Sequence, residues 1–442
     1  MKKIKLAYVA LFIALTGLWL MADTVLSTAY SFFALRASLI NYSGILGIGV
    51  MSVAIMLAVR PVLFEPYLGG LDKMYRLHKW LGITGLVISV IHWAWAQVPK
   101  WLVGSGLIER PVRIRPPEET VAIFKYFQSQ RGLAEAIGEW AFYAAVVLII
   151  LALVKRFPYR HFFKTHRLLA IVYLFLVFHA VVLMKFSFWG EVVGPVMAVL
   201  MIGGSVAAFV VLFRRVGQSR QAVGEIEAIA HHKDLQVIEV TIQFKGRWAG
   251  HEAGQFAFVT FDEKEGAHPY TISSAWKGDG RIAFIIKGLG DYTHTLSAAL
   301  KTGDVVKVEG PYGRFNFRSS KPRQIWVGGG IGITPFIARM KVLANQPDGT
   351  TIDLFHTTAV LDDAAIAKLE RDALAANVRL HVLVDARDGL LSTERICQAI
   401  PEWQSADVWF CGPAGFGQAL RKDFIARGLP PDDFHQELFH IR

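Results

Sequence analysis

Four histidines lie inside very apolar sequence, in two pairs of nearly equal spacing. His78 and His92 are 14 positions apart, and His166 and His179 are 13 apart. An imidazole inside a membrane segment is expensive because lipid offers its ring nitrogens no partner, so such histidines are usually functional. At about 1.5 Å per residue, 14 positions cover roughly 21 Å, about two-thirds of the apolar thickness of a bilayer. The spacing predicts two metal centres, such as haems, one in each leaflet.

The two spacings differ in helical phase. On an ideal helix, 14 residues return to within about 40° of the same face, whereas 13 residues end about 140° away. The second pair therefore needs a local change of winding, such as a π-bulge, or haems seated at different angles. The alternative for these histidines is a purely structural role, with the rings bonded to backbone carbonyls or cavity water.

Composition divides the chain into an apolar, basic half and a balanced half. The 442 residues are 53% hydrophobic, with a mean hydropathy of +0.38. Residues 1–217 carry 22 lysines and arginines against 9 acidic residues, and residues 218–442 carry 25 against 27. This asymmetry predicts a membrane domain joined to a soluble one. Loops that face anionic lipid explain the basic surplus, so nucleic-acid binding is not expected.

Six apolar stretches are long enough to span a bilayer. We expect an uncleaved first span, because no small-residue cleavage site follows it. With the N-terminus inside, the inner flanks carry 14 lysines and arginines and the outer flanks carry 8, which places the second half in the cytoplasm. A long outer loop is expected over residues 99–135. The stretches are Leu6–Ala22, Leu39–Val59, Leu77–Ala96, Ala136–Val154, Leu168–Met184 and Val192–Phe213.

Two further domains are expected in the second half. In the first of them, residues 218–322, residues 224–310 alternate with period two and are rich in glycine, which favours a small antiparallel β-barrel. Residues 323–442 follow a strand, loop, helix rhythm that favours an open α/β sheet of Rossmann type. The only cysteines are Cys397 and Cys411, so haem cannot be attached covalently through a Cys-x-x-Cys-His motif.

Three short motifs in this half suit phosphate and flavin. Val327–Phe336 places four glycines between a strand and a helix, where backbone can approach a pyrophosphate. Pro269–Ser274 displays hydroxyl donors suited to a flavin, and Gly288–Thr293 offers a glycine turn with Thr293 as the expected helix N-cap. Each motif taken alone could equally be a plain turn.

Taken together and in this order, the motifs resemble the NADPH oxidase and ferric reductase superfamily over about residues 38–442. That family joins a haem-binding membrane domain with His-x13-His and His-x12-His spans to a half similar to ferredoxin-NADP reductase. The resemblance implies that His78, His92, His166 and His179 ligate two b-type haems. It assigns FAD binding to His268, Pro269, Tyr270, Thr271, Ser273, Lys287, Gly290, Asp291, Tyr292 and Thr293.

The resemblance also implies where the coenzyme and the acceptor act. A family Glu-x-Phe ending corresponds to Glu437–Phe439, where Phe439 would cover the flavin. An arginine before the second span corresponds to Arg36 near an oxygen site, while a histidine of that site is replaced by Ala96. NADPH is preferred over NADH, with Arg387 as a substitute reader of the 2′-phosphate. The coenzyme residues are Gly328, Gly329, Gly330, Ile331, Gly332, Thr334, Pro335, Cys411, Gly412 and Pro413.

The sequence therefore predicts a multi-pass flavocytochrome b of the inner, cytoplasmic membrane. Electrons from cytoplasmic NAD(P)H would pass through FAD and two haems to an outer acceptor, with O2 giving superoxide as the first expectation. One alternative is a ferric or other metal reductase. Another is a haem-binding membrane anchor whose flavin domain serves a soluble partner. Membrane lipid and O2 or a ferric chelate are the expected partners, with no obligatory protein partner.

Overall fold

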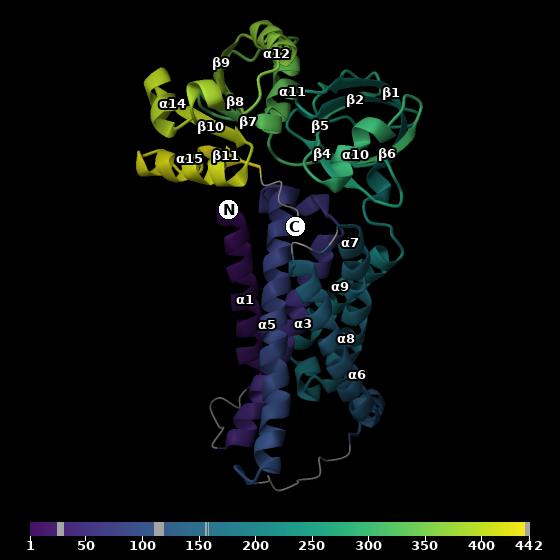
Figure 1. The fold of residues 1–442 in the computed structure, drawn as a ribbon. Helices are drawn as coiled ribbons and strands as arrows, with labels where there is room; N and C mark the ends of the chain where they lie inside the picture. The colour runs from purple at the N-terminus through teal and green to yellow at the C-terminus, as the bar shows by residue number, and fades with distance from the viewer. Residues whose placement is uncertain (24–30, 110–118, 155–156, 158, 438–442) are drawn as a thin grey trace. The chain divides into compact units, whose positions relative to one another are not determined.

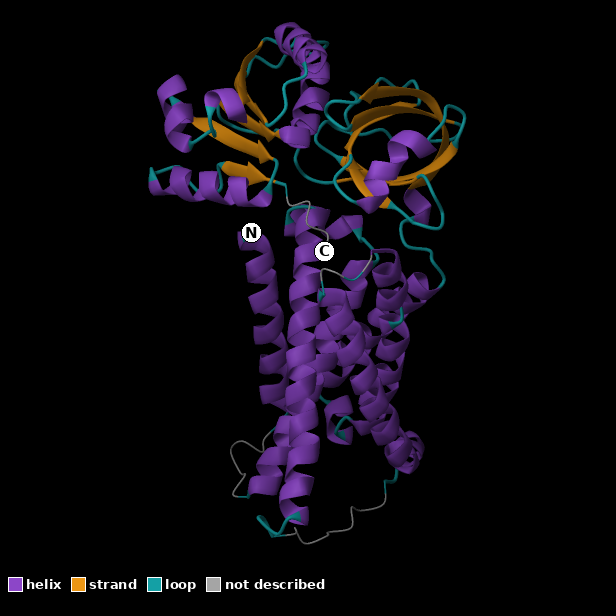
Figure 2. Cartoon of the chain, viewed as in Figure 1, coloured by secondary structure: helices purple, strands orange, loops and turns teal. Residues whose placement is uncertain are grey.

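A computed structural model describes residues 1–23, 31–109, 119–154, 157 and 159–437 of the chain (Figure 1). The chain divides into two compact units, one formed by residues 1–216 and the other by residues 217–440. The first unit is helical, and the second carries two β-sheets (Figure 2). Each unit is described by itself.

In the first unit, six helical segments of the described residues are long and apolar enough to cross a membrane. The fifth of these spans is formed by two helices in sequence, α7 and α8. The helices of this unit are α1 Lys2–Ala22, α3 Phe32–Ala58, η1 Val62–Phe64, α4 Glu65–Leu68, α5 Leu71–Gly104, α6 Ala122–Leu153, α7 Tyr159–Arg167, α8 Leu169–Leu183, η2 Phe186–Gly190 and α9 Val193–Leu212.

Four helices, α1, α3, α5 and α6, are longer than hydropathy predicts. Helix α3 begins seven residues before Leu39, because the Ser31 side chain caps it by accepting a hydrogen bond from the Ala34 backbone N–H at 3.2 Å. The expected outer loop 99–135 is wrong over much of its length, since α5 continues to Gly104 and α6 begins at Ala122. A helix that is already nucleated adds one hydrogen bond per further residue, so it continues past its apolar stretch.

The predicted change of winding lies at Leu168, between α7 and α8. There the Leu168 N–H donates to the Thr165 carbonyl at 3.0 Å, and the Ile171 N–H donates to the Leu168 carbonyl at 3.0 Å. These hydrogen bonds run to the carbonyl three residues earlier, as in a 3-10 helix, where each residue turns the helix by about 120°. The extra turn brings His179 closer to the helix face of His166, as a spacing of 14 would on an ideal α-helix. The prediction of a local winding change is confirmed, but it is a tightening, whereas a π-bulge would loosen the helix.

The second unit begins with an antiparallel sheet of six strands in the order β4-β3-β6-β1-β2-β5. Its edge strands β4 and β5 are joined only by an isolated bridge between Ile272 and Phe284, so a closed barrel is not confirmed. The elements of this half are η3 Gln218–Arg220, β1 Gln221–His232, β2 Val237–Phe244, β3 Phe256–Thr260, β4 His268–Thr271, β5 Arg281–Lys287, α10 Asp291–Ala299 and β6 Val305–Tyr312.

The rest of the second unit is a parallel sheet of five strands in the order β11-β10-β7-β8-β9, with helices on both faces. Helices α11 and α12 pack on one apolar cluster and α14 and α15 on the other. The elements are β7 Arg323–Gly329, η4 Gly330–Ile333, α11 Thr334–Leu343, β8 Thr351–Thr358, α12 Asp363–Ala375, β9 Val378–Val384, α13 Asp385–Asp388, α14 Thr393–Ala399, η5 Trp403–Ser405, β10 Ala406–Cys411, α15 Ala414–Ala426 and β11 Phe434–Gln436.

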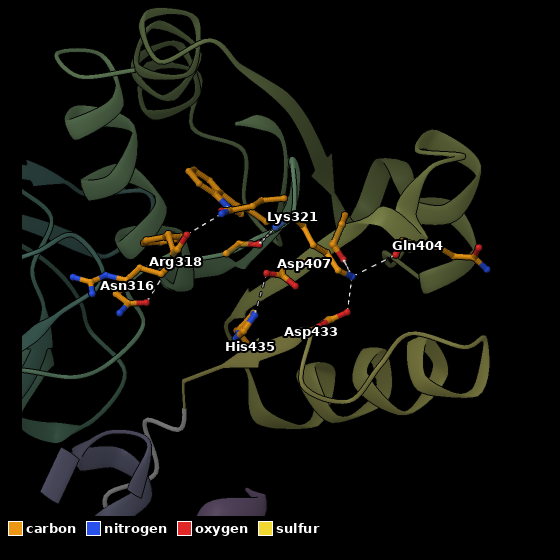
Figure 3. A network of polar contacts seen from close by, with 12 residues as sticks. Asn316, Arg318, Lys321, Gln404, Asp407, Asp433 and His435 are labelled. Carbon is orange, nitrogen blue, oxygen red and sulfur yellow. Dashed lines mark hydrogen bonds and ion pairs between the residues drawn. The ribbon is translucent and has the colours of Figure 1, made fainter. Parts of the chain in front are cut away.

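A polar network closes the amino-terminal end of this parallel sheet (Figure 3). Lys321 donates to Asp433 at 2.5 Å and to the Ala406 carbonyl at 3.2 Å, which ties the chain before β7 to the neighbouring strands. His435 lies 3.5 Å from the Asp407 carboxylate and stacks on Trp409. This end is therefore engaged in structural contacts. Ligands are expected at the opposite end, where β7 ends in Gly329 and Gly412 follows β10.

Candidate functional site

The four histidines meet in two facing pairs between α5 and α7–α8. The ring centroids of His78 and His166 are 5.9 Å apart, and those of His92 and His179 are 6.2 Å apart. The interplanar angles are 73° and 81°. Each pair takes one ring from each helical span, in the pairing that the spacing predicts.

Three of the four rings are anchored through Nδ1. His78 Nδ1 lies 2.8 Å from the Ala54 carbonyl, and His179 Nδ1 lies 2.8 Å from the Ala134 carbonyl. A carbonyl can only accept, so in these two rings Nδ1 carries the proton and Nε2 keeps its lone pair. His92 Nδ1 lies 3.0 Å from the hydroxyl of Ser43. His166 differs, because its buried Nδ1 has no hydrogen-bond partner among the described residues.

Glycine makes room for His92 and His179, which the predicted orientation places in the outer leaflet and which are called the outer pair below. A methyl group on Gly138 of α6 would overlap the His179 ring, so only glycine fits there while the ring keeps this position. A methyl group on Gly44 of α3 would touch His92 at 3.5 Å, which is ordinary contact. The His179 ring is therefore seated in a space that one residue of α6 leaves open.

This geometry fits two axially ligated haem irons. With each iron–nitrogen bond at about 2 Å, an iron between two imidazoles places their ring centroids about 6 Å apart. No group of three or more metal-ligating side chains gathers in the described part of the chain. A porphyrin supplies four nitrogens of its own, so two axial imidazoles suffice for it and would not suffice for a bare ion.

Arg36 lies inside α3 and contacts α5. Its Nε donates to the Trp95 carbonyl at 2.9 Å, and its terminal nitrogen donates to the Ala96 carbonyl at 3.0 Å. Two of the guanidinium nitrogens therefore donate to backbone carbonyls, which the sequence did not suggest. Its assignment to an oxygen site stays a prediction.

The flavin motifs lie on β4 and at the start of α10. The rings of His268 and Tyr292 stack with centroids 4.8 Å apart, which brings these two flavin motifs together. Burial lowers the pKa of His268, although Glu265 acts in the opposite direction. The Ser273 hydroxyl is buried and has no partner among the described residues. An unpartnered buried donor next to these motifs fits a bound flavin, which would supply the missing acceptor.

The expected N-cap of α10 is wrong. The helix begins at Asp291 after Gly290, so Thr293 is the third helical residue. The Thr293 hydroxyl instead accepts from the backbone N–H groups of Leu289 and Gly290 at 2.9 and 3.0 Å. A hydroxyl at this position reaches back to the amides that precede the helix, as in a capping box.

The two coenzyme motifs meet at the carboxyl ends of β7 and β10. A methyl group on Gly332 would overlap the Cys411 carbonyl, and one on Gly329 would lie 2.9 Å from Pro413. Gly330 has a φ of +54° and open space around it. Burial raises the pKa of Cys411 well above its usual value, so the side chain is a neutral thiol. The helix that follows, α11, directs its N-terminal amides toward this turn, as a pyrophosphate requires.

Lys341 connects the flavin half to the coenzyme half within the second unit. From the last turn of α11 it donates to the Ser273 carbonyl at 3.0 Å. Lys368 of α12 also pairs with Glu239 of β2 at 2.7 Å. Burial lowers the pKa of Lys341, while Glu239 acts to raise it. Lys287 and Lys341 line one cavity together with Gly330, Ile331 and His356.

Among the remaining predicted residues, Thr334 and Arg387 form hydrogen bonds within the protein, and one residue is not described. Thr334 donates to the Ile331 carbonyl at 2.7 Å, so its hydroxyl is occupied. Arg387 forms two bonds to Asp388, at 3.0 and 2.9 Å, at the carboxyl end of β9. Phe439 lies outside the described residues. The role of Ser43, Gly138 and Lys341 was missed, because nothing in their spacing marks them and each acts on a residue distant in sequence.

The site and its fold define a class, a membrane-embedded flavoprotein oxidoreductase. Residues 43–177 match the family described as "Ferric reductase like transmembrane component", and residues 225–350 match "FAD-binding domain". The chain is thus similar in its first half to ferric reductase membrane components and in its second half to FAD-binding oxidoreductases, and six of its described helical segments are long and apolar enough for a multi-pass membrane protein.

Three relatives illustrate the range of proteins that the chain resembles. The chain is 26% identical to the toluate 1,2-dioxygenase electron transfer component of Pseudomonas putida, over 50% of this chain and 68% of that protein. It is 29% identical to an NADPH oxidoreductase of Mycobacterium tuberculosis, over 40% of this chain and 47% of that protein. It is 29% identical to a superoxide-generating NADPH oxidase heavy chain of Dictyostelium discoideum, over 50% of this chain and 43% of that protein. The chain thus spans less than half the length of the last two.

Proposed function

We propose that this protein carries electrons across the membrane from NAD(P)H to an acceptor on the opposite side. FAD would accept a hydride and release single electrons, which two b-type haems would carry onward. The chain's own part is to hold these groups in sequence and in fixed orientation. The observation that carries the proposal is the pair of facing imidazole couples, each with the ring separation that an axially ligated iron needs.

Charge supports a direction for this transfer. The excess of lysine and arginine on one set of flanks favours a cytoplasmic nucleotide-binding unit in the inner membrane. His92 and His179 would hold the haem nearer the acceptor, and that haem would supply one-electron transfer to an acceptor that does not bind to its iron. O2 giving superoxide is the first choice. The match to a ferric reductase-like component favours a ferric chelate as the second.

The test uses sealed vesicles whose nucleotide-binding unit faces outward. NADPH added outside should reduce an acceptor trapped in the lumen, and His179→Leu should abolish that reduction while flavin reduction continues. His161→Leu is the matched control, because His161 is an exposed histidine of α7. Purified protein should contain two low-spin b-type haems per chain.

Two outcomes would defeat the proposal. One is lumenal reduction that persists in the His179→Leu protein, and the other is wild-type protein that reduces only acceptors on the nucleotide side. Superoxide formed in the lumen under air favours the oxidase, whereas ferric chelate reduction without superoxide favours the metal reductase.

A further inference from the structure

Arg36 is hydrogen-bonded to two consecutive carbonyls of a neighbouring helix. Its Nε–H donates to the Trp95 carbonyl of α5 at 2.9 Å, and its terminal nitrogen donates to the Ala96 carbonyl at 3.0 Å. A guanidinium is planar and presents its donors as a rigid fork, so it can serve two adjacent acceptors at once. Carbonyls inside an α-helix normally accept from the N–H four residues later. A side chain of another helix can donate to the Trp95 carbonyl only if the usual donor within α5 is missing or shared.

The reason lies four residues further along α5. The partner of the Trp95 carbonyl would be the N–H of residue 99, and residue 99 is proline, which has none. Pro99 is buried and lies in the interior of the helix. A backbone carbonyl that has lost its partner within a membrane span finds no donor in lipid. The Nε–H of Arg36 supplies the donor that the proline lacks.

The other proline of a described membrane helix does not open the hydrogen-bond ladder. Pro195 lies in the first turn of α9, which begins at Val193. N–H groups in the first turn have no intrahelical acceptor, so a proline there removes no bond. Arg36 thus lies beside the proline that does remove a bond, and the Pro195 position needs no counterpart.

We infer that Arg36 is a positioning residue that completes α5 at Pro99 and thereby holds His92. His92 lies three residues before Trp95, so the repaired turn is the one that follows the histidine along α5. Through these two bonds α3 fixes the outer part of α5, and α3 also contacts the His92 ring through Ser43. The link to His92 rests on the proposed function, whereas the pairing of Arg36 with Pro99 does not.

A double-mutant cycle tests this inference on the full-length protein in detergent. Its members are wild type, Arg36→Ala, Pro99→Ala and the double variant, with Arg36→Ala/Pro195→Ala as the matched control. Melting temperature and hydrogen exchange over residues 95–100 report on the helix. The electron paramagnetic resonance signal of the outer pair and the rate of acceptor reduction report on His92.

Arg36→Ala should lower the melting temperature, raise exchange at these residues and broaden the outer signal. Pro99→Ala restores the missing N–H, so it should at least halve each of these losses, and Pro195→Ala should restore none. If Arg36→Ala does not accumulate, recovery of accumulation in the Pro99→Ala background, but not in the Pro195→Ala background, supports the inference equally.

Two results would overturn it. If Arg36→Ala lowers the melting temperature equally in the wild-type and the Pro99→Ala backgrounds, Arg36 does not complete α5. If the Arg36→Ala/Pro99→Ala variant recovers its melting temperature but still does not reduce the acceptor, Arg36 acts on the acceptor and is not a positioning residue for His92. Absence of haem from wild-type protein would defeat the proposed function, and the melting and exchange measurements would still decide the pairing of Arg36 with Pro99.

Discussion

At the scale of single residues, the histidine pairs differ mainly in what holds the far side of each ring. Two rings face carbonyls, one faces the Ser43 hydroxyl, and His166 has no partner among the described residues. A hydrogen bond from Nδ1–H to an oxygen makes the imidazole a stronger electron donor through Nε2. The four imidazoles are therefore not equivalent as the proposed haem ligands.

Ser43 is expected to set the properties of the outer pair through His92. The Ser43 hydroxyl donates its proton to the Leu39 carbonyl at 2.7 Å, so its oxygen accepts from His92 Nδ1–H. Ser43→Ala removes this acceptor, so the ring should donate less and the reduced iron should be favoured. A net hydrogen bond of about 0.5–1.5 kcal/mol corresponds to an upward shift of about 20–60 mV for one electron. Potentiometric titration of the haem bands measures it, and Ser43→Thr, which keeps the hydroxyl, is the control. An unchanged outer potential in Ser43→Ala would contradict this role.

At the scale of helices, one residue of α6 decides whether the His179 ring can occupy its place. A methyl group on Gly138 would overlap that ring, whereas one on Gly132, in the same helix, would meet nothing within 4 Å. We expect Gly138→Ala to lower haem content from two to one per chain, and Gly132→Ala to leave it at two. Overpacking of this kind costs about 1–3 kcal/mol. Pyridine haemochrome analysis measures the content, and equal contents in the two variants would contradict the prediction.

The buried strand β10 gives a prediction about pH. Burial would raise the pKa of Asp407, but bonds from His435 and Ser319 and the charge of Lys321 hold it below its usual value. A carboxyl with a lowered folded-state pKa adds stability above its unfolded pKa of about 3.9, and that stability is lost as pH falls through the folded pKa. Asp407→Asn should therefore lower the unfolding free energy by about 1 kcal/mol at neutral pH.

The difference between wild type and Asp407→Asn should close in strong acid, where the wild-type carboxyl is protonated. Urea unfolding of the full chain in detergent, followed by tryptophan fluorescence from pH 7 downward, measures it. Glu370→Gln, at an exposed carboxylate of α12, is the control. A difference that stays constant with pH would show that the charge on Asp407 does not stabilise the sheet.

The sequence predicted the elements better than the contacts between them. The pairing of His78 with His166 followed from spacing, because helical rise converts residue number into depth. The ends of α5 and α6 and the N-cap of α10 were not predicted correctly, and a closed barrel is not confirmed, since each depends on bonds that local pattern does not encode. The partners of Arg36 and of the Nδ1 atoms come from residues 24 to 60 positions away. No local rule relates such residues.

At the scale of the second unit, the flavin and coenzyme halves are joined by few polar contacts. Lys341 of α11 donates to the Ser273 carbonyl beside the flavin motif, and α11 begins at the glycine turn that would hold the coenzyme. Helix α11, of ten residues, is therefore one route by which a displacement at one motif can reach the other. Lys341 is the residue through which this transmission can be tested.

Lys341→Met should slow flavin reduction by NADPH while FAD content stays unchanged. The substitution keeps the apolar stem but removes the donor, so the flavin motif loses its bond to α11. Loss of a charged donor of this kind costs about 1.5–3 kcal/mol when it acts on the transition state, roughly a 10- to 100-fold slower step. Stopped-flow absorbance measures it, with Lys422→Met on the surface of α15 as control and Lys341→Arg as the variant expected to recover. Equal rates in the Lys341→Met and wild-type proteins would exclude the role.

The unequal anchoring of the four imidazoles has a consequence for biogenesis. His92 Nδ1 lies within hydrogen-bond distance of the Ser43 hydroxyl and His179 Nδ1 within that of the Ala134 carbonyl, whereas the His166 ring stacks on Phe162 and its Nδ1 has no partner among the described residues. On the proposed function, we expect the outer pair to be better ordered before haem binds, so that scarce haem enters it first. A newly synthesised chain short of haem would then carry haem at the exit of its electron path and lack it at the entrance.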